Sequence, residues 1–131
     1  TESFTQAITI AATGPLIVQA LSAAEKLAQA GVGTIVVNPS IINRPDVDTF
    51  VSCLQKTEGR LLTVEDHQGA GGMAAVLTHS LLQAGLSELK LKSLAVNDCF
   101  GQSAYQAIEL YQKHGLDAER IAHIGQKLLK Y

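Results

Sequence analysis

A short stretch near the middle of the chain holds most of the side chains that could do chemistry. It places two carboxylates and an imidazole directly after an apolar run, with three glycines behind them: Glu65, Asp66, His67, Gly69, Gly71 and Gly72. An imidazole beside carboxylates could act as a general acid or base. Glycines before a helix could leave its free backbone N–H groups open to an anion such as phosphate.

A third interpretation of this stretch is architectural, and the sequence favours it. The polar residues would orient the loop, cap the next helix and contact another subunit. The flanking carboxylates would repel an anion, and the phosphate-binding pattern GxxxxGK[ST] is absent. We therefore treat the six residues as an interface or anion loop and assign no catalytic, cofactor-binding or metal-binding residue.

The cysteines and the remaining histidines give no competing site. Cys99 lies beside Asp98, whose charge opposes thiolate formation, so we expect an inert thiol. Cys53 falls on a helical apolar pattern, where a packed small hydrophobe is expected. The other three histidines stand alone on predicted helices, where solvent exposure or capping is expected in preference to metal binding: His79, His114 and His123.

Buried-strand and amphipathic-helix patterns alternate along the chain. Short apolar runs predict four strands, at Ala7–Thr13, Thr34–Asn38, Leu61–Val64 and Leu89–Val96. Helical spacing predicts helices from about Ile17 to Gly31, from Asp46 or Asp48 to near Gly59, from Met73 to about Gly85, and over Ser103–Lys113 and Ala118–Leu129, with Asp117 as a candidate N-cap.

This alternation predicts an α/β sandwich with a largely parallel sheet. Ligands of such sheets bind where the carboxyl ends of the strands meet the following loops. Three polar loops qualify, at Thr13–Pro15, Glu65–Gly72 and Asn97–Ser103.

Composition narrows the class of protein. The chain has 131 residues, of which 47% are hydrophobic and 17% charged, which suits one globular domain over residues 1–131. A net charge of −2 gives no support for nucleic acid, and no apolar run approaches the roughly 18 residues of a membrane span. Two cysteines without a CxxC pattern predict a cytoplasmic protein. Because the chain begins at Thr1 without Met, we expect a fragment or a processed chain.

A series of motifs in one order resembles the C-terminal domain of transketolases, from about Ala7 to Ile121. The most specific is GRLLTVEDH at Gly59–His67, with Gly71-Gly72 behind it. The others are ATGP at Ala12–Pro15, TIVVNP at Thr34–Pro39, IINRPD at Ile41–Asp46, LAVN at Leu94–Asn97, FGQS at Phe100–Ser103 and GLDAERI at Gly115–Ile121. Related thiamine enzymes, 1-deoxyxylulose-5-phosphate synthase and the β-chains of 2-oxo acid dehydrogenases, share parts of this series.

The resemblance implies a three-layer α/β/α sandwich around a mostly parallel, mixed five-stranded sheet with one antiparallel strand. We predict only four strands from the sequence, so a fifth strand would be a short one or would lie near Ile41–Ile42. It also implies that the whole enzyme uses thiamine diphosphate and Mg²⁺, held by N-terminal and middle domains that are absent from this chain. No GDG triplet, the cofactor motif of that family, occurs here.

Three hypotheses for function follow. In the first, the chain is the C-terminal domain of a transketolase, which moves a two-carbon ketol unit from a ketose phosphate to an aldose phosphate in the pentose phosphate pathway. Its own role would be to stabilise a homodimer, and the isolated domain would be inactive. In the second, it is a stand-alone module for a small anion or nucleotide. In the third, it is a separate subunit of a split transketolase or a related thiamine enzyme.

Overall fold

Strands and helices alternate along the chain, as the apolar runs and amphipathic segments predict. The computed structural model describes residues 4–39, 45–68, 72–96 and 117–131. The elements are β1 (Gln6–Ala12), α1 (Leu16–Gln29), β2 (Val32–Val37), α2 (Val47–Lys56), β3 (Arg60–Gln68), α3 (Met73–Gln83), β4 (Lys90–Val96) and α5 (Ala118–Leu128). None of the described helices is long and apolar enough to cross a membrane.

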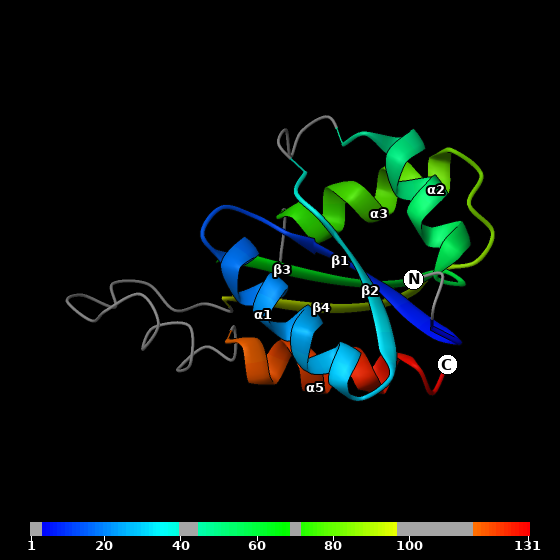
Figure 1. The fold of residues 1–131 in the computed structure, drawn as a ribbon. Coiled ribbons are helices and arrows are strands. Elements are labelled where there is room, and N and C mark those ends of the chain that lie inside the picture. The colour runs from blue at the N-terminus through cyan, green and yellow to red at the C-terminus, as the bar shows by residue number, and fades with distance from the viewer. Residues whose placement is uncertain (1–3, 40–44, 69–71, 97–116) are drawn as a thin grey trace.

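The strands form one sheet in the order β2-β1-β3-β4, and all three pairings are parallel. Helices α1 and α5 cover one face of the sheet and α2 and α3 cover the other (Figure 1). The predicted three-layer α/β/α sandwich is therefore confirmed, with four strands in the described part of the chain. The segment Ile41–Ile42, where we expected a fifth strand, lies outside the described residues.

Each face of the sheet has its own apolar core, because successive residues of a strand point to opposite faces. Ile8 and Ile10 of β1 pack toward α1 and α5, whereas Ala11 packs toward α2 and α3. On the first face α5 lies close to the sheet: a Cβ added to Gly125 would stand 2.8 Å from Cδ1 of Ile8. A glycine inside this helix costs helix stability, and here it permits the close approach.

The N-cap residues of the helices agree only in part with those predicted from the sequence. Of the two candidate caps of α2, Asp46 is the one used, since its side chain accepts a 3.1 Å hydrogen bond from the Thr49 N–H. Asp117 occupies the N-cap position of α5, but its side chain makes no capping hydrogen bond. Instead Oε1 of Gln19, on α1, accepts from the Ala118 N–H at 3.1 Å. The helix predicted over Ser103–Lys113 lies outside the described residues.

Candidate functional site

The carboxyl ends of β1 and β3 form the centre of the candidate site. From β1 the chain crosses to β2 on one side, and the next strand, β3, pairs with β1 on the other side. In open α/β sheets ligands bind at this point of reversed strand order. The Thr13 N–H donates to the Val64 carbonyl at 3.3 Å, which joins the turn after β1 to the end of β3.

Glu65 lies at this junction and is 1% exposed. Its two carboxylate oxygens accept hydrogen bonds from the first two N–H groups of α3: Oε1 from Met73 and Oε2 from Ala74, each at 2.9 Å. A helix N-terminus has unpaired N–H groups and a partial positive charge, so a carboxylate there is both hydrogen-bonded and electrostatically favoured. Glu65 therefore caps α3, one of the roles that the sequence left open.

The capping bonds also limit what this helix start can do for a ligand. An anion placed there would have to displace an intramolecular carboxylate from the two N–H groups it already occupies. Nearby, Oγ1 of Thr13 is buried without a hydrogen-bond partner among the described residues. Because Glu65 already accepts from both N–H groups, the described geometry favours a structural joint between β3 and α3 over an anion-binding site.

The predicted loop after β3 begins later than the sequence indicates. We expected β3 to end at Val64, but the strand continues to Gln68, so Glu65, Asp66 and His67 belong to β3. The pairing with β4 shifts register between Val64 and Gln68, a β-bulge or irregularity that lets these polar residues continue the strand.

The other residues of the predicted loop are located only in part. Gly72 is the N-cap residue of α3. The side chains of Asp66 and His67, and residues Gly69 and Gly71, lie outside what the structure describes. The function of this segment as an interface or anion loop stays a prediction.

The described thiol and imidazoles do not form a reactive cluster. Burial raises the pKa of the half-buried Cys53 thiol above its usual 9.0, with Lys56 opposing the rise, so thiolate is disfavoured. His79 and His123 are exposed on α3 and α5. Cys99 and His114 lie outside the described residues. Within the described ranges, no group of three His, Cys, Asp or Glu residues could hold a metal ion.

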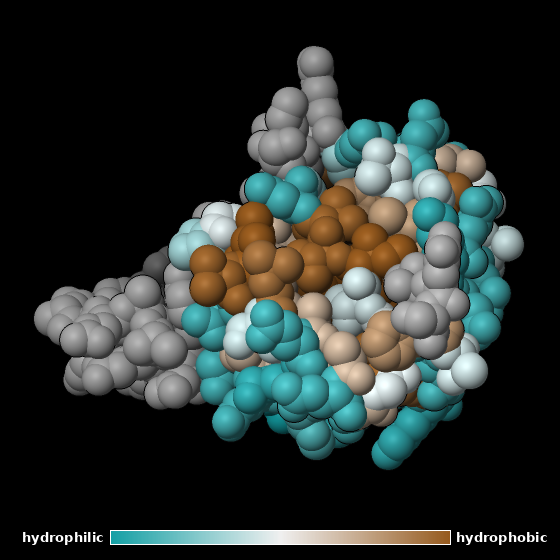
Figure 2. Space-filling view, in the orientation of Figure 1, coloured by the Kyte–Doolittle hydropathy of each residue, from teal (hydrophilic) through white to brown (hydrophobic). Residues whose placement is uncertain are grey.

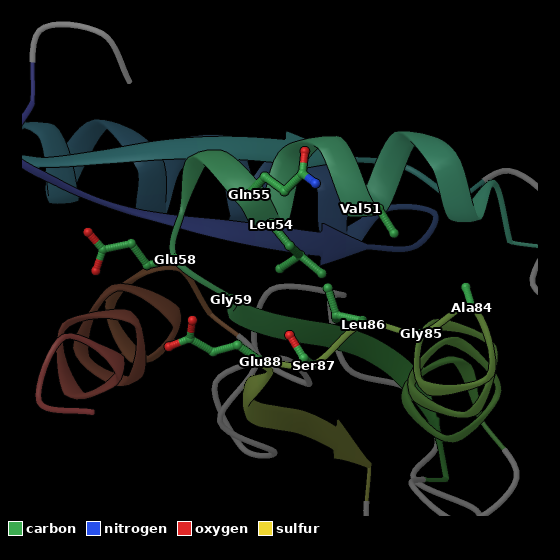
Figure 3. A pocket seen from close by; sticks show the side chains of 10 residues that line it. All are labelled: Val51, Leu54, Gln55, Glu58, Gly59, Ala84, Gly85, Leu86, Ser87 and Glu88. Carbon is green, nitrogen blue, oxygen red and sulfur yellow. The ribbon is translucent and has the colours of Figure 1, made fainter.

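A groove at the opposite, amino end of the sheet is a feature that the sequence did not reveal. It has a volume of about 440 Å³ and lies between the end of α2 and the turn from α3 to β4. In Figure 3, Leu54 and Leu86 lie at its centre, with Glu58 and Glu88 together at one end. The two sides of the groove come into close contact at Gly59, since a Cβ there would stand 2.6 Å from the Glu88 carbonyl oxygen.

Both carboxylates of the groove are neutralised by cations of the same chain. Glu58 pairs with Arg60 at 3.1 Å and Glu88 pairs with Lys90 at 3.0 Å. Arg60 and Lys90 are register partners on β3 and β4, so the two ion pairs are neighbours. In the sequence, each ion pair could have been recognised from an acidic residue that stands two positions before a basic residue at the start of a strand. These pairs stabilise turns, and they leave no free carboxylate for acid–base chemistry among the described residues of the groove.

Comparison with known proteins agrees with this architecture. A family model described as "Transketolase, C-terminal domain" matches residues 2–121. A "Putative transketolase C-terminal section" from Methanocaldococcus jannaschii is 35% identical over 115 residues, covering 88% of this chain and 34% of that protein. "Transketolase-like protein 2" from Bos taurus is 33% identical over 112 residues, covering 77% of this chain and 18% of that protein.

A solved structure described as "Split gene transketolase, inactive beta4 tetramer" superposes with a TM-score of 0.83 at 30% identity, covering 95% of this chain and 40% of the other. This chain thus spans only about a fifth to two fifths of the length of these three proteins. Sequence order, strand order and tertiary structure all agree, and the chain belongs to the transketolase C-terminal domain family.

Proposed function

We propose that this chain is the C-terminal domain of an enzyme that transfers a two-carbon ketol unit from a ketose phosphate to an aldose phosphate. The role of the domain is to stabilise the assembly of that enzyme, which is a homodimer in the cytoplasm. Family membership supports the class of reaction. The observation that carries the assembly role is an apolar face that the described residues leave uncovered.

This apolar face lies over α1 and β2, where Figure 2 shows hydrophobic surface gathered on one side of the molecule. On α1, Val18 is 67% exposed and Leu21 is 52% exposed. Strand β2 is an edge of the described sheet, and its residues Ile35, Val36 and Val37 are only half-buried. Contiguous apolar surface and an unpaired strand edge are both typical of protein interfaces.

Thiamine diphosphate and Mg²⁺, which the family implies for the whole enzyme, do not fit the described residues of this domain. The natural cradle for a diphosphate is a helix N-terminus after a strand, and at α3 Glu65 fills it. The described residues also lack a set of ligands for a metal ion. In this proposal the other domains or a partner chain hold the cofactor, the sugar phosphates and the reacting groups.

The apolar face provides the experiment. Val18→Asp combined with Leu21→Asp puts two charges on it, and Leu82→Asp is a matched control, because Leu82 is 56% exposed on the opposite layer. In the complete protein with thiamine diphosphate and Mg²⁺, we expect the double variant to lower the native mass and to abolish ketol transfer. Leu82→Asp should keep both, and circular dichroism should be unchanged in all. A double variant that stays assembled and active would contradict the assembly role.

A second candidate, a separate subunit of a split enzyme, is supported by two of the comparisons. One relative is described as a C-terminal section and one structure as the product of a split gene. The intact mass of the protein in its source cell distinguishes the two. A single chain several times 13.9 kDa supports the one-chain enzyme. A smaller chain that copurifies with a thiamine-binding partner supports the split one.

A further inference from the structure

A hollow of about 460 Å³ lies at the amino end of the sheet, where the ends of α1 and α5 meet the first residues of β1 and β2. We call it the α5 hollow. Its polar lining residues are Gln6, His123, Gln126, Lys127 and Lys130. It lies on the α1–α5 face of the sheet, whereas the groove of Figure 3 is formed by residues from the α2–α3 face.

The charge of the α5 hollow is positive and uncompensated within the described residues. His123 and Lys127 are four residues apart, which places them on one side of α5, and Lys130 follows in the turn after the helix. All three are exposed, and none of the residues lining the hollow is acidic.

The groove of Figure 3 shows how this chain neutralises charge elsewhere. There, each carboxylate has a cation two residues along the chain, at 3.0–3.1 Å. The lysines of the α5 hollow have no such partner among the described residues. They stabilise the end of the helix dipole, which explains a cation in the last turn. That role does not account for the glutamine amides that line the same space.

The size and lining of the α5 hollow define a ligand class. Its volume falls within the roughly 300–1,000 Å³ of small-molecule sites. Two ammonium groups suit a dianionic phosphate, and the Gln6 and Gln126 amides can both donate to and accept from a polar body. Val32, which is 4% exposed, and the half-buried Leu129 supply an apolar part of the lining.

We propose that the α5 hollow binds the phosphate monoester of a small polar metabolite. The hollow lies at the end of the sheet opposite Glu65. The proposal is independent of ketol transfer, because none of its residues takes part in the apolar face or in the β3–α3 joint. Binding there would make this domain a ligand-responsive part of a larger protein.

Isothermal titration of the complete protein tests this, with AMP and glucose 6-phosphate as monoesters, adenosine and glucose as uncharged controls, and inorganic phosphate. We expect at least one monoester to bind more tightly than inorganic phosphate, and neither uncharged compound to bind. Lys127→Gln combined with Lys130→Gln should weaken monoester binding by about tenfold. Lys56→Gln, which removes one exposed charge on α2, should leave it unchanged.

Two results would overturn the proposal: no heat from either monoester at millimolar concentration, or equal affinities in the double variant and the unaltered protein. Because Lys127 and Lys130 are exposed, the double variant loses only their interaction with the helix dipole, and its unfolding temperature should fall by no more than a few degrees. Loss of binding is then not a loss of fold. Ketol transfer measured on the same samples reports separately on the proposed function.

Discussion

One glutamate precedes β3 and another lies in its second half, and the protein uses them in opposite ways. Before the strand, Glu58 has a side chain that is 65% exposed and pairs with Arg60. Near the other end, Glu65 is 1% exposed and accepts two backbone N–H groups of α3. The same residue type thus serves as a surface ion pair and as a buried helix cap. Burial and the hydrogen-bond partners decide how much each carboxylate contributes to stability.

Removing the buried carboxylate should have the largest effect. Glu65→Ala leaves two N–H groups of α3 unpaired in a dry site and deletes side-chain volume. We expect the free energy of unfolding to fall by about 3–4 kcal/mol. Urea denaturation measures the change. Glu65→Gln keeps one acceptor and should lose less, and a loss below about 1 kcal/mol in the Ala variant would show that the cap is dispensable.

The glycines at the two ends of the sheet offer a matched pair. Gly14 at the carboxyl end has φ +52° with open space around it, and Gly59 at the amino end has φ +77° and no room for a Cβ. Alanine is strained in both conformations. Gly14→Ala should cost about 1 kcal/mol and Gly59→Ala about 2–3 kcal/mol, because only the latter meets the Glu88 carbonyl. Equal thermal shifts for the two variants would contradict the close contact.

Glu58 should respond to backbone strain as well as to charge. It is a non-glycine residue at φ +55°, a region that L residues avoid. Glu58→Ala and Glu58→Gly both remove the ion pair with Arg60, but only glycine relieves the strain. The Gly variant should therefore be more stable than the Ala variant by about 1 kcal/mol in urea denaturation. An Ala variant that equals or exceeds the Gly variant would refute the strain.

The smallest effect should come from the exposed local cap of α2. Hydrogen bonds from the Thr49 hydroxyl and backbone N–H hold the pKa of Asp46 below its usual 3.8. A lowered folded-state pKa contributes stability that is present above the unfolded value and lost as the pH falls through the folded one. Asp46→Ala should thus destabilise the protein at pH 6 by less than Glu65→Ala, and the difference from the unaltered protein should shrink below pH 4. A constant difference down to pH 2 would exclude this linkage.

The contrast between Asp46 and Glu65 also explains what the sequence could predict. The Asp46 cap joins residues three apart, so spacing alone identifies it. Glu65 reaches the start of a helix eight residues later, and Gln19 reaches Ala118 across 99 residues. Such partners are set by tertiary packing, and no local pattern encodes them. The strands and helices were predictable because periodic burial is itself local.

The length of β3 was missed for a related reason. The strand was predicted from its hydrophobic pattern, and by that criterion the polar residues after Val64 indicate a loop. In the structure they continue the strand, because a buried hydrogen-bonded carboxylate can replace an apolar side chain. The Figure 3 groove was missed because it is formed by two turns that are distant in sequence and meet at Gly59 and Glu88.

The hydrogen bond between Gln19 and Ala118 joins α1 to α5, and it bears on how the protein folds during synthesis. Helix α5 supplies much of one apolar core, including Ile121, Ile124 and Leu128. Until the ribosome has released α5, the inner side of α1 and one face of β1 lack that cover. Contacts of such long range close late in folding. The nascent chain must therefore keep this incomplete apolar core from aggregating until α5 emerges.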